Sequence, residues 1–242
     1  MRRRILLIAP VVTALVAGAC APSRDARIEE VLRRSRAAPE KIVALESPYL
    51  ADPDRDVRAI SAWAIGYAAG PGAASSLAPL VRDPEPAVRR AAVIALCRAG
   101  GTESTEPLAA LIGDGDVAVR RALARCFVSS SLAPPGGLAR LLEDDDKEIR
   151  ISAVTALVAH PDPEAIDSLA GMLRKREPDE QLAAVAALRA LADPGALPAL
   201  ESAAASRLSP SVREPVEAAI LELRAILPGP PDAAVRGEKP DR

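Results

Sequence analysis

The residue types that most often perform catalysis are scarce in this chain. His160 is the only histidine among 242 residues, and it stands directly before Pro161-Asp162-Pro163, at the expected end of a helix. A histidine in that place more often binds helix-end carbonyl groups than it transfers protons. A single histidine also cannot form a histidine-based metal cluster. We therefore expect no catalytic residues, no metal and no cofactor, and a protein that is not an enzyme.

The other motifs that carry chemistry are also missing. Asp144-Asp145-Asp146 could suggest calcium binding, but the run lacks the alternating ligands and the distal glutamate of an EF-hand loop. The chain contains no glycine-rich phosphate loop, no Cys-x-x-Cys pair and no Gly-x-Ser-x-Gly motif. The three aspartates are better interpreted as a solvated corner between two helices.

The strongest pattern is a block, Asp-x-x-x-x-(Val/Ile)-Arg-x-x-x-x-x-Ala-(Leu/Ile/Phe), that recurs about every thirty-one residues. Successive copies are 31, 31, 30, 31 and 32 residues apart. A period in this range is typical of one supersecondary unit stacked on itself. The central pairs are Val57-Arg58, Val88-Arg89, Val119-Arg120, Ile149-Arg150, the degenerate Glu180-Gln181 and Val212-Arg213.

Each copy has the pattern of two helices. Counted from the valine or isoleucine as position 0, apolar or small residues occupy positions 4, 7 and 8, which form one stripe of a helix. Alanine dominates position 7, which suggests a close crossing of helices. A shorter apolar helix precedes each copy, and the two are separated by a polar corner. No strand pattern of period two occurs in the sequence, so we expect an all-α fold.

The repeated aspartate and arginine can be interpreted in two ways. Asp52, Asp83, Asp114 and Asp144 each stand six residues before the arginine of their own copy. Stacking would place both groups in rows, where they can pair bidentately and cap backbone amides. The alternative is an arginine row that grips a ligand. Lys175, Arg207 and Gln181 interrupt the pattern, so any such ladder should weaken towards the C-terminus.

The two-helix unit, with L-x-x-L-(hydrophobic)-x-D in the first helix and V-R-x-x-A in the second, resembles HEAT repeats. It is most similar to the short HEAT-like type also found in phycobilin lyases, and the resemblance covers residues 39–227. It implies a right-handed α-solenoid of about six repeats that binds proteins through the surface of its second helices. A bilin lyase or isomerase-like subunit and a purely structural module remain alternatives.

The N-terminus has the pattern of an export signal over residues 1–19. Three arginines precede an uncharged apolar run, Ile5 to Ala17, which is too short for an ordinary bilayer span. The run ends Val16-Ala17-Gly18-Ala19-Cys20 and resembles the lipobox of bacterial lipoproteins. The resemblance implies a lipid on Cys20 and a place in the bacterial cell envelope, at the outer membrane if the host is Gram-negative. A secreted or periplasmic soluble protein and an uncleaved anchor are the alternatives.

The segments at the two ends of the repeats complete the expected domain plan. Residues 20–38 should hold the lipid site, a tether and a short amphipathic capping helix at 24–36, and residues 228–242 a disordered tail. Without the three signal arginines the chain has 28 basic and 33 acidic residues, so its net charge falls from −2 to −5. This acidity argues against nucleic acid as a partner.

Cys97 and Cys126 could form a disulfide in an exported protein. Their positions in the repeat differ, however: Cys97 stands nine residues after its valine and Cys126 seven. We expect them to face different directions on neighbouring helices, unbonded, as small apolar fillers.

The side of the second helices opposite the core stripe, positions 2, 6 and 9, is unusually apolar for a solvent face. It includes the only tryptophan, and apolar and aromatic groups ringed by arginine are typical of protein-binding surfaces. Alternatively, Trp63 simply packs near the N-terminal cap. The expected contact residues for an unknown partner protein are Trp63, Tyr67, Arg90, Ile94, Arg121 and Arg125.

Overall fold

The computed structural model describes residues 22–37, 41–68, 72–175 and 177–226, and within these ranges every regular element is a helix. None of these helices is long and apolar enough to cross a bilayer. The all-α prediction is therefore confirmed. The expected signal at 1–19, the lipid site at Cys20 and the tail at 228–242 lie outside the described residues.

Six two-helix units follow one solitary helix, α1 (Arg24–Ala37). The second helices are long and regular, whereas four of the six first helices include a turn of 3-10 helix. The second helices are α3 (Arg55–Ala68), α5 (Pro86–Ala99), α7 (Val117–Ser129), α9 (Lys147–Ala159), α11 (Pro178–Leu191) and α13 (Pro210–Ile226). The first helices are α2 (Ile42–Glu46) with η3 (Ser47–Ala51), α4 (Ala73–Leu77) with η4 (Ala78–Arg82), η5 (Thr102–Ser104) with α6 (Thr105–Ala109), α8 (Gly137–Leu142), η6 (Pro163–Ala165) with α10 (Ile166–Leu173), and α12 (Ala196–Ala204).

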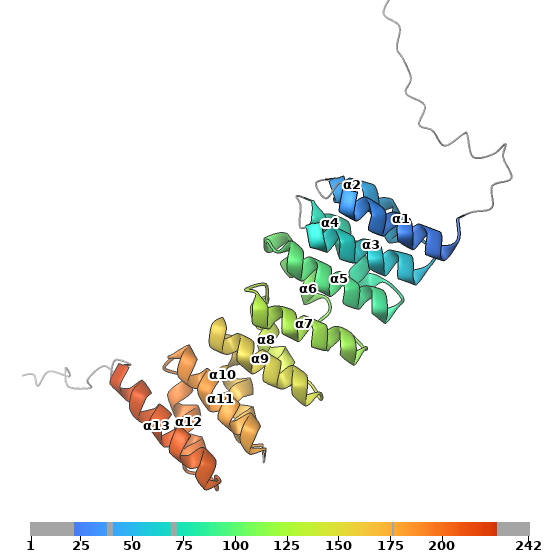
Figure 1. Cartoon of the computed structure of the whole chain (residues 1–242). Coiled ribbons are helices and arrows are strands. Elements are labelled where there is room, and N and C mark those ends of the chain that lie inside the picture. Colours follow the sequence, from blue (N-terminus) through green and yellow to red (C-terminus); the bar gives the residue numbers. More distant parts are fainter. Residues whose placement is uncertain (1–21, 38–40, 69–71, 176, 227–242) are drawn as a thin grey trace, which may run out of the picture.

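The units stack into an elongated array of two layers, with the second helices side by side in one row (Figure 1). Helix α1 packs against α3 at the N-terminal end of this row. Its Arg27 stands 31 residues before Arg58, so the repeat period extends back to it. Helix α1 therefore occupies the place of a second helix, and no first helix precedes it within the described residues.

Helix ends follow from local chemistry in the polar corners. The side chains of Asp116 and Asp146 accept hydrogen bonds from backbone amides in the first turns of α7 and α9. Proline begins α5 and α11, where its missing N–H costs nothing. Gly100, with φ 66°, follows the last residue of α5.

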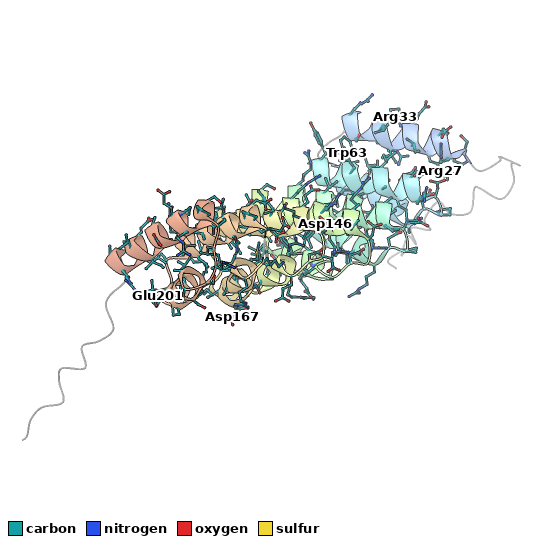
Figure 2. All side chains as sticks on the ribbon, turned by 90° about the horizontal axis from the view of Figure 1, so that it is seen from below. Arg27, Arg33, Trp63, Asp146, Asp167 and Glu201 are labelled. Atoms are coloured by element: carbon teal, nitrogen blue, oxygen red, sulfur yellow. A yellow bond between two sulfur atoms is a disulfide. The ribbon has the colours of Figure 1, made fainter. Side chains whose placement is uncertain are left out.

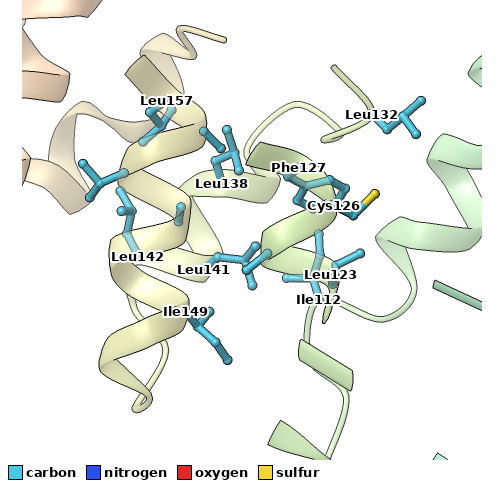
Figure 3. Packing of buried hydrophobic residues seen from close by; sticks show 14 of the residues in the cluster. Ile112, Leu123, Cys126, Phe127, Leu132, Leu138, Leu141, Leu142, Ile149 and Leu157 are labelled. Atoms are coloured by element: carbon cyan, nitrogen blue, oxygen red, sulfur yellow. The ribbon is translucent and has the colours of Figure 1, made fainter. Parts of the chain in front are cut away.

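The core lies between the two layers. The residues at position 0 are fully buried wherever they are valine or isoleucine, and the alanines at position 7 are buried as well. In the middle of the array, Leu123 and Phe127 of α7, Leu138 and Leu141 of α8 and Leu157 of α9 belong to the same buried cluster (Figure 3). One apolar cluster runs from α1 to α13, so each unit depends on its neighbours for burial.

A ladder of ion pairs connects consecutive units at the polar corners. The Arg58 guanidinium donates to both carboxylate oxygens of Asp83, at 2.7 and 2.9 Å, and also to the Asp52 carbonyl at 2.8 Å. Asp83 in turn accepts the backbone N–H of Glu85 at 2.9 Å. The structural interpretation of the Val-Arg block is therefore correct.

The same geometry recurs along the chain. Arg89 pairs with Asp114 and Arg120 with Asp144, and Arg27 of α1 forms the first pair, with Asp52. These aspartate side chains are at most 8% exposed. Burial alone would raise the pKa of Asp83, Asp114 and Asp144, but hydrogen bonds from arginine and the backbone outweigh it and leave the pKa lowered. The pairs thus stabilise the ionised form.

The ladder changes at the fifth unit. The buried Glu180 takes the place of the corner aspartate and pairs with Arg150, although it occupies the normally apolar position 0. Gln181 replaces the arginine and donates to the carbonyls of Leu173 and Lys175, at 2.9 and 2.7 Å. Arg213 reaches two carbonyls only at 3.4 Å. The expected weakening towards the C-terminus is confirmed, with Glu180 extending the ladder by one step.

The expectation that Cys97 and Cys126 are unbonded is wrong, because they form a disulfide between α5 and α7. The register argument overlooked how neighbouring second helices cross. Position 9 of one helix meets position 7 of the next: a Cβ on Gly66 would lie 2.4 Å from the Ala95 Cα, and the two cysteine Cα atoms are 5.8 Å apart. The disulfide therefore occupies a crossing point that Gly66 and Ala95 fill one unit earlier.

The ladder makes a testable contribution to stability. Arg89→Ala should lower the free energy of unfolding by about 3 kcal/mol at pH 7, because Asp114 loses its bidentate partner. Arg213→Ala, which removes no bidentate pair, should lower the free energy of unfolding by less than about 1 kcal/mol. Urea unfolding followed by circular dichroism measures both. The difference should shrink as the pH falls below 3.8, the usual aspartate pKa, and disappear only below the lowered pKa of Asp114 in the folded protein, where this carboxylate is protonated as well. Equal effects of the two variants at pH 7 would contradict the ladder.

Reduction of the disulfide should lower the free energy of unfolding by about 3–4 kcal/mol, since the bond closes a loop with a sequence separation of 29. A Cys97→Ser/Cys126→Ser double variant should show no response to the reductant. Alkylation of both thiols in the native, unreduced exported protein would show that the bond is absent.

Candidate functional site

The second helices and α1 expose one continuous stripe, positions 2, 6 and 10 of each unit, which we call the outer face. Position 10 rather than position 9 belongs to it near the N-terminus, because Gly66 is buried against α5 and Cys97 is joined to α7. The N-terminal part of the outer face consists of Ile28, Leu32 and Arg36 of α1, Ala59, Trp63 and Tyr67 of α3, and Arg90, Ile94 and Arg98 of α5.

An aromatic pair lies at the centre of this part. Trp63 and Tyr67, one helical turn apart, stack with ring centroids at 5.4 Å, and the Arg98 guanidinium lies 5.7 Å from the centre of the Tyr67 ring. The exposed fractions are 44% for Trp63, 66% for Tyr67 and 41% for Ile94. Large apolar groups this exposed, and held by stacking, are suited to contact with another molecule.

A cavity opens beside the aromatic pair, between α1, α2 and α3. Its volume is about 430 Å³. The lining is mostly apolar, and Trp63 lies at the end of the array formed by α1 and α3, where it projects from the ribbon (Figure 2). The Trp63 ring thus lies next to the N-terminal helix and forms a wall of an open cavity, and its contact with a partner stays a prediction. The lining residues are Leu32, Ser35, Arg36, Ile42, Trp63, Ala64, Tyr67 and Ala68.

The arginines expected to contact a partner fall into two groups. Arg121 pairs bidentately with Asp146, at 3.1 and 2.6 Å, and Arg125 pairs with Glu148. Arg90, by contrast, is exposed and forms no ion pair with any residue in the described ranges. Arg121 and Arg125 are thus neutralised within the protein, whereas Arg90 is available.

Two further arginines of the outer face, Arg36 and Arg98, also form no ion pair within the described part of the chain. The sequence interpretation missed both, together with Leu32 and Ile42 of the cavity. Arg98 occupies position 10, which was not counted as part of the face. Leu32 and Arg36 lie on α1, whose place in the repeat becomes apparent once the period is extended back to Arg27.

The C-terminal half of the outer face has a different character. It is built from Ile151 and Thr155 of α9, Leu182 and Ala186 of α11, and Glu214 and Glu222 of α13. Arg189 pairs with Glu222 at 3.0 Å, and no aromatic residue is present in the described residues of this half. The face therefore runs from aromatic and basic at one end to small, apolar and acidic at the other.

The described residues contain no cluster of three metal-binding side chains. His160 follows the last residue of α9, where its backbone N–H donates to the Ala156 carbonyl at 2.7 Å. Its side chain lines a depression of about 260 Å³ between two proline-rich loops. Ser131 and Asp162 line the same depression, but the Asp162 carboxylate accepts the backbone N–H groups of Gly136 and Glu164, and no hydrogen bond joins either residue to the His160 side chain within the described ranges.

Two side chains of the first two-helix unit, one on α2 and one on α3, have buried polar atoms without a hydrogen-bond partner among the described residues. Both carboxyl oxygens of Glu46, the last residue of α2, are buried without a partner, as is the hydroxyl of Ser61 in α3. Burial raises the pKa of Glu46 from 4.5 to about 7; the charge of Arg34 opposes this shift and that of Glu30 adds to it. The N-terminal unit therefore holds a carboxyl group that favours its neutral form.

The fold and its exposed helix row define a helical repeat solenoid, and solved structures of that class are similar to it. An engineered protein is 20% identical, with 77% of this chain and 96% of that chain covered and a TM-score of 0.55. A designed armadillo repeat protein is 21% identical, with coverages of 74% and 98% and a TM-score of 0.50. Another, in complex with the peptide (KR)4, is 20% identical with the same coverages and a TM-score of 0.53.

HEAT repeats match residues 43–126 and 135–221, which is well over half of the chain. The protein belongs to the HEAT repeat family, as the two-helix unit led us to expect. A comparison with curated proteins found no match.

Glu46 should make stability depend on pH in a distinctive direction. The unfolded chain ionises this group near pH 4.5, whereas the folded protein does so near pH 7. The contribution of Glu46 to the free energy of unfolding is fully present below pH 4.5. It is lost as the pH rises through 7, which lowers the free energy of unfolding by about 3 kcal/mol. Glu46→Gln should remove that loss in unfolding experiments between pH 4.5 and 8, while exposed Glu106→Gln should keep the wild-type profile. If the stability of Glu46→Gln changed with pH in the same way as that of the wild type, Glu46 would not be the source of the pH dependence.

Proposed function

We propose that this protein is a non-enzymatic, envelope-anchored HEAT-repeat adaptor or scaffold that binds a partner protein through the outer face. The observation that carries the proposal is the stacked Trp63–Tyr67 pair, exposed beside an open apolar cavity. Aromatic anchors that fill pockets dominate the energy of protein interfaces. The aromatic pair, Ile94 and Arg90 would form the centre of the contact.

The rigidity of the scaffold supports this role. The ladder, the close crossing at Gly66 and the disulfide fix the relative positions of α1, α3, α5 and α7. A surface fixed in advance loses little conformational entropy on binding, so more of the contact energy remains as affinity. The designed armadillo protein that holds the peptide (KR)4 supports the idea that a stack of this kind can present a peptide-binding face.

The disulfide supports export. Such bonds persist in oxidising compartments and are rare in the cytosol. An export signal at residues 1–19 and a lipid on Cys20 would place the repeats at an envelope membrane and raise their local concentration beside a partner there.

Affinity capture from envelope extracts tests partner binding. The mature protein should retain a specific partner, and Trp63→Ala should lose it while the thermal melting temperature falls by less than about 4 °C. The matched control is Leu221→Ala, which truncates an exposed apolar residue of α13. Partner loss with both variants, or unfolding of Trp63→Ala, would contradict the proposal and favour a packing role.

Lipid anchoring requires a separate experiment. Cells expressing the full chain should incorporate radiolabelled palmitate into the protein and retain it in the membrane fraction. Cys20→Ser should abolish the label and release the protein into the soluble envelope fraction. Membrane retention of unlabelled Cys20→Ser would instead indicate an uncleaved anchor.

A further inference from the structure

We propose that the partner segment bound at the N-terminal end of the outer face is an acidic peptide with one large apolar side chain. The apolar side chain would enter the cavity between α1, α2 and α3, and the carboxylates would pair with Arg36, Arg90 and Arg98. This inference rests on the proposed function and specifies the chemistry of the partner.

The size and the lining of the cavity favour a large apolar side chain of the peptide, which we call the anchor. At about 430 Å³ it falls within the usual size range of ligand pockets, and it has room for one large side chain. Leu32, Ile42 and Trp63 supply apolar walls from three different helices. Because these walls come from helices packed against one another, an aliphatic or aromatic side chain would bury its apolar surface in the cavity.

The positive charge around the cavity favours acidic residues on either side of the apolar residue in the peptide. Arg36, Arg90 and Arg98 have no carboxylate partner among the described residues. Of the described acidic residues in this part of the array, Asp56 pairs with Arg24 and Glu85 with Arg55. Glu29 lines a surface depression together with Arg36 but forms no ion pair with it. Farther along the row, Arg121, Arg125 and Arg189 do have internal carboxylate partners. The unpaired positive charge is thus confined to the part of the face that surrounds the aromatic pair.

The helix dipole accounts for only part of this pattern. Arg36 and Arg98 lie in the last turns of α1 and α5, where a basic side chain is favourable without any ligand. Arg90 lies in the first half of α5, where that explanation fails. Arg90, Ile94 and Arg98 form one exposed line at intervals of four residues. An apolar side chain thus lies between two positive charges, which matches a peptide that carries both carboxylates and an apolar side chain.

The spacing of the helices sets the length of the segment. Neighbouring helix axes are about 8–10 Å apart, so α1 and α5 lie about 16–20 Å apart across α3. An extended chain advances about 3.3 Å per residue, and five or six residues would span that distance. The expected segment therefore places its carboxylates about two or three residues on either side of the anchor.

Trp63 is the only tryptophan in the chain, so its fluorescence reports directly on the cavity. The experiment titrates the mature protein with tryptophan-free nine-residue peptides. A peptide with glutamates flanking a central leucine should give a saturable change in emission, weaker at high salt. The same peptide with glycine in place of leucine, and a lysine-flanked leucine peptide, should each bind at least roughly tenfold more weakly.

Charge reversal provides the matched variants. Arg36→Glu and Arg98→Glu should each lower the affinity for the acidic leucine peptide by roughly tenfold. Each change replaces about one favourable ion pair by repulsion between like charges. Arg140→Glu is the control, because Arg140 is an exposed arginine of α8 outside the outer face. All three variants should keep the wild-type melting curve.

Several results would overturn the inference: no saturable change with the acidic leucine peptide, equal binding of the lysine-flanked peptide, or equal weakening by Arg140→Glu. Tighter binding of single-stranded oligonucleotide than of the acidic peptide would also overturn it, by assigning the arginines to phosphate. If envelope capture still depends on Trp63 while the acidic peptides fail, the adaptor function stands and only the proposed partner chemistry falls.

Discussion

The ion pair between the arginine of one unit and the carboxylate of the next is the interaction on which the stacking register depends. A two-helix unit of this size cannot bury its apolar face alone, so it must dock on its neighbours in one register. Apolar contact is non-directional and would tolerate small shifts. The bidentate pair is directional, and each arginine also binds a carbonyl of its own corner. A shift of one helix along another would break both contacts and leave a buried charge unpaired.

The fixed register makes the exposed positions of successive helices coincide. Trp63, Ile94 and Arg125 become neighbours across the row because the Val-Arg block places their helices in equivalent positions. The block thus has no direct role in binding, but it determines which non-repeating residues meet on the outer face. The crossing at positions 9 and 7, closed by a glycine in one unit and by a disulfide in the next, adds a second constraint in the same part of the array.

The sequence was sufficient to predict the fold, because the repeat period, the apolar stripe and the polar corners all favour the same two-helix unit. It was also sufficient to place Trp63 and Ile94 on an exposed surface, since both lie opposite the buried positions. The disulfide could not be obtained from helix register alone, because it depends on the crossing angle between helices rather than on either helix. The cavity was missed for a related reason: α1 carries arginine and glutamate where the other units carry apolar residues, so its membership of the row is visible only from Arg27 and its pair with Asp52.

The central claim is that contact with the partner occurs at the N-terminal end of the outer face. Site-specific photo-crosslinking in living cells tests it most directly, with a photoreactive side chain placed at Tyr67 or at Leu221, the two most exposed large apolar residues at opposite ends of the row. The account predicts a discrete crosslinked partner from position 67 and none from position 221. A partner crosslinked from position 221 alone would contradict it.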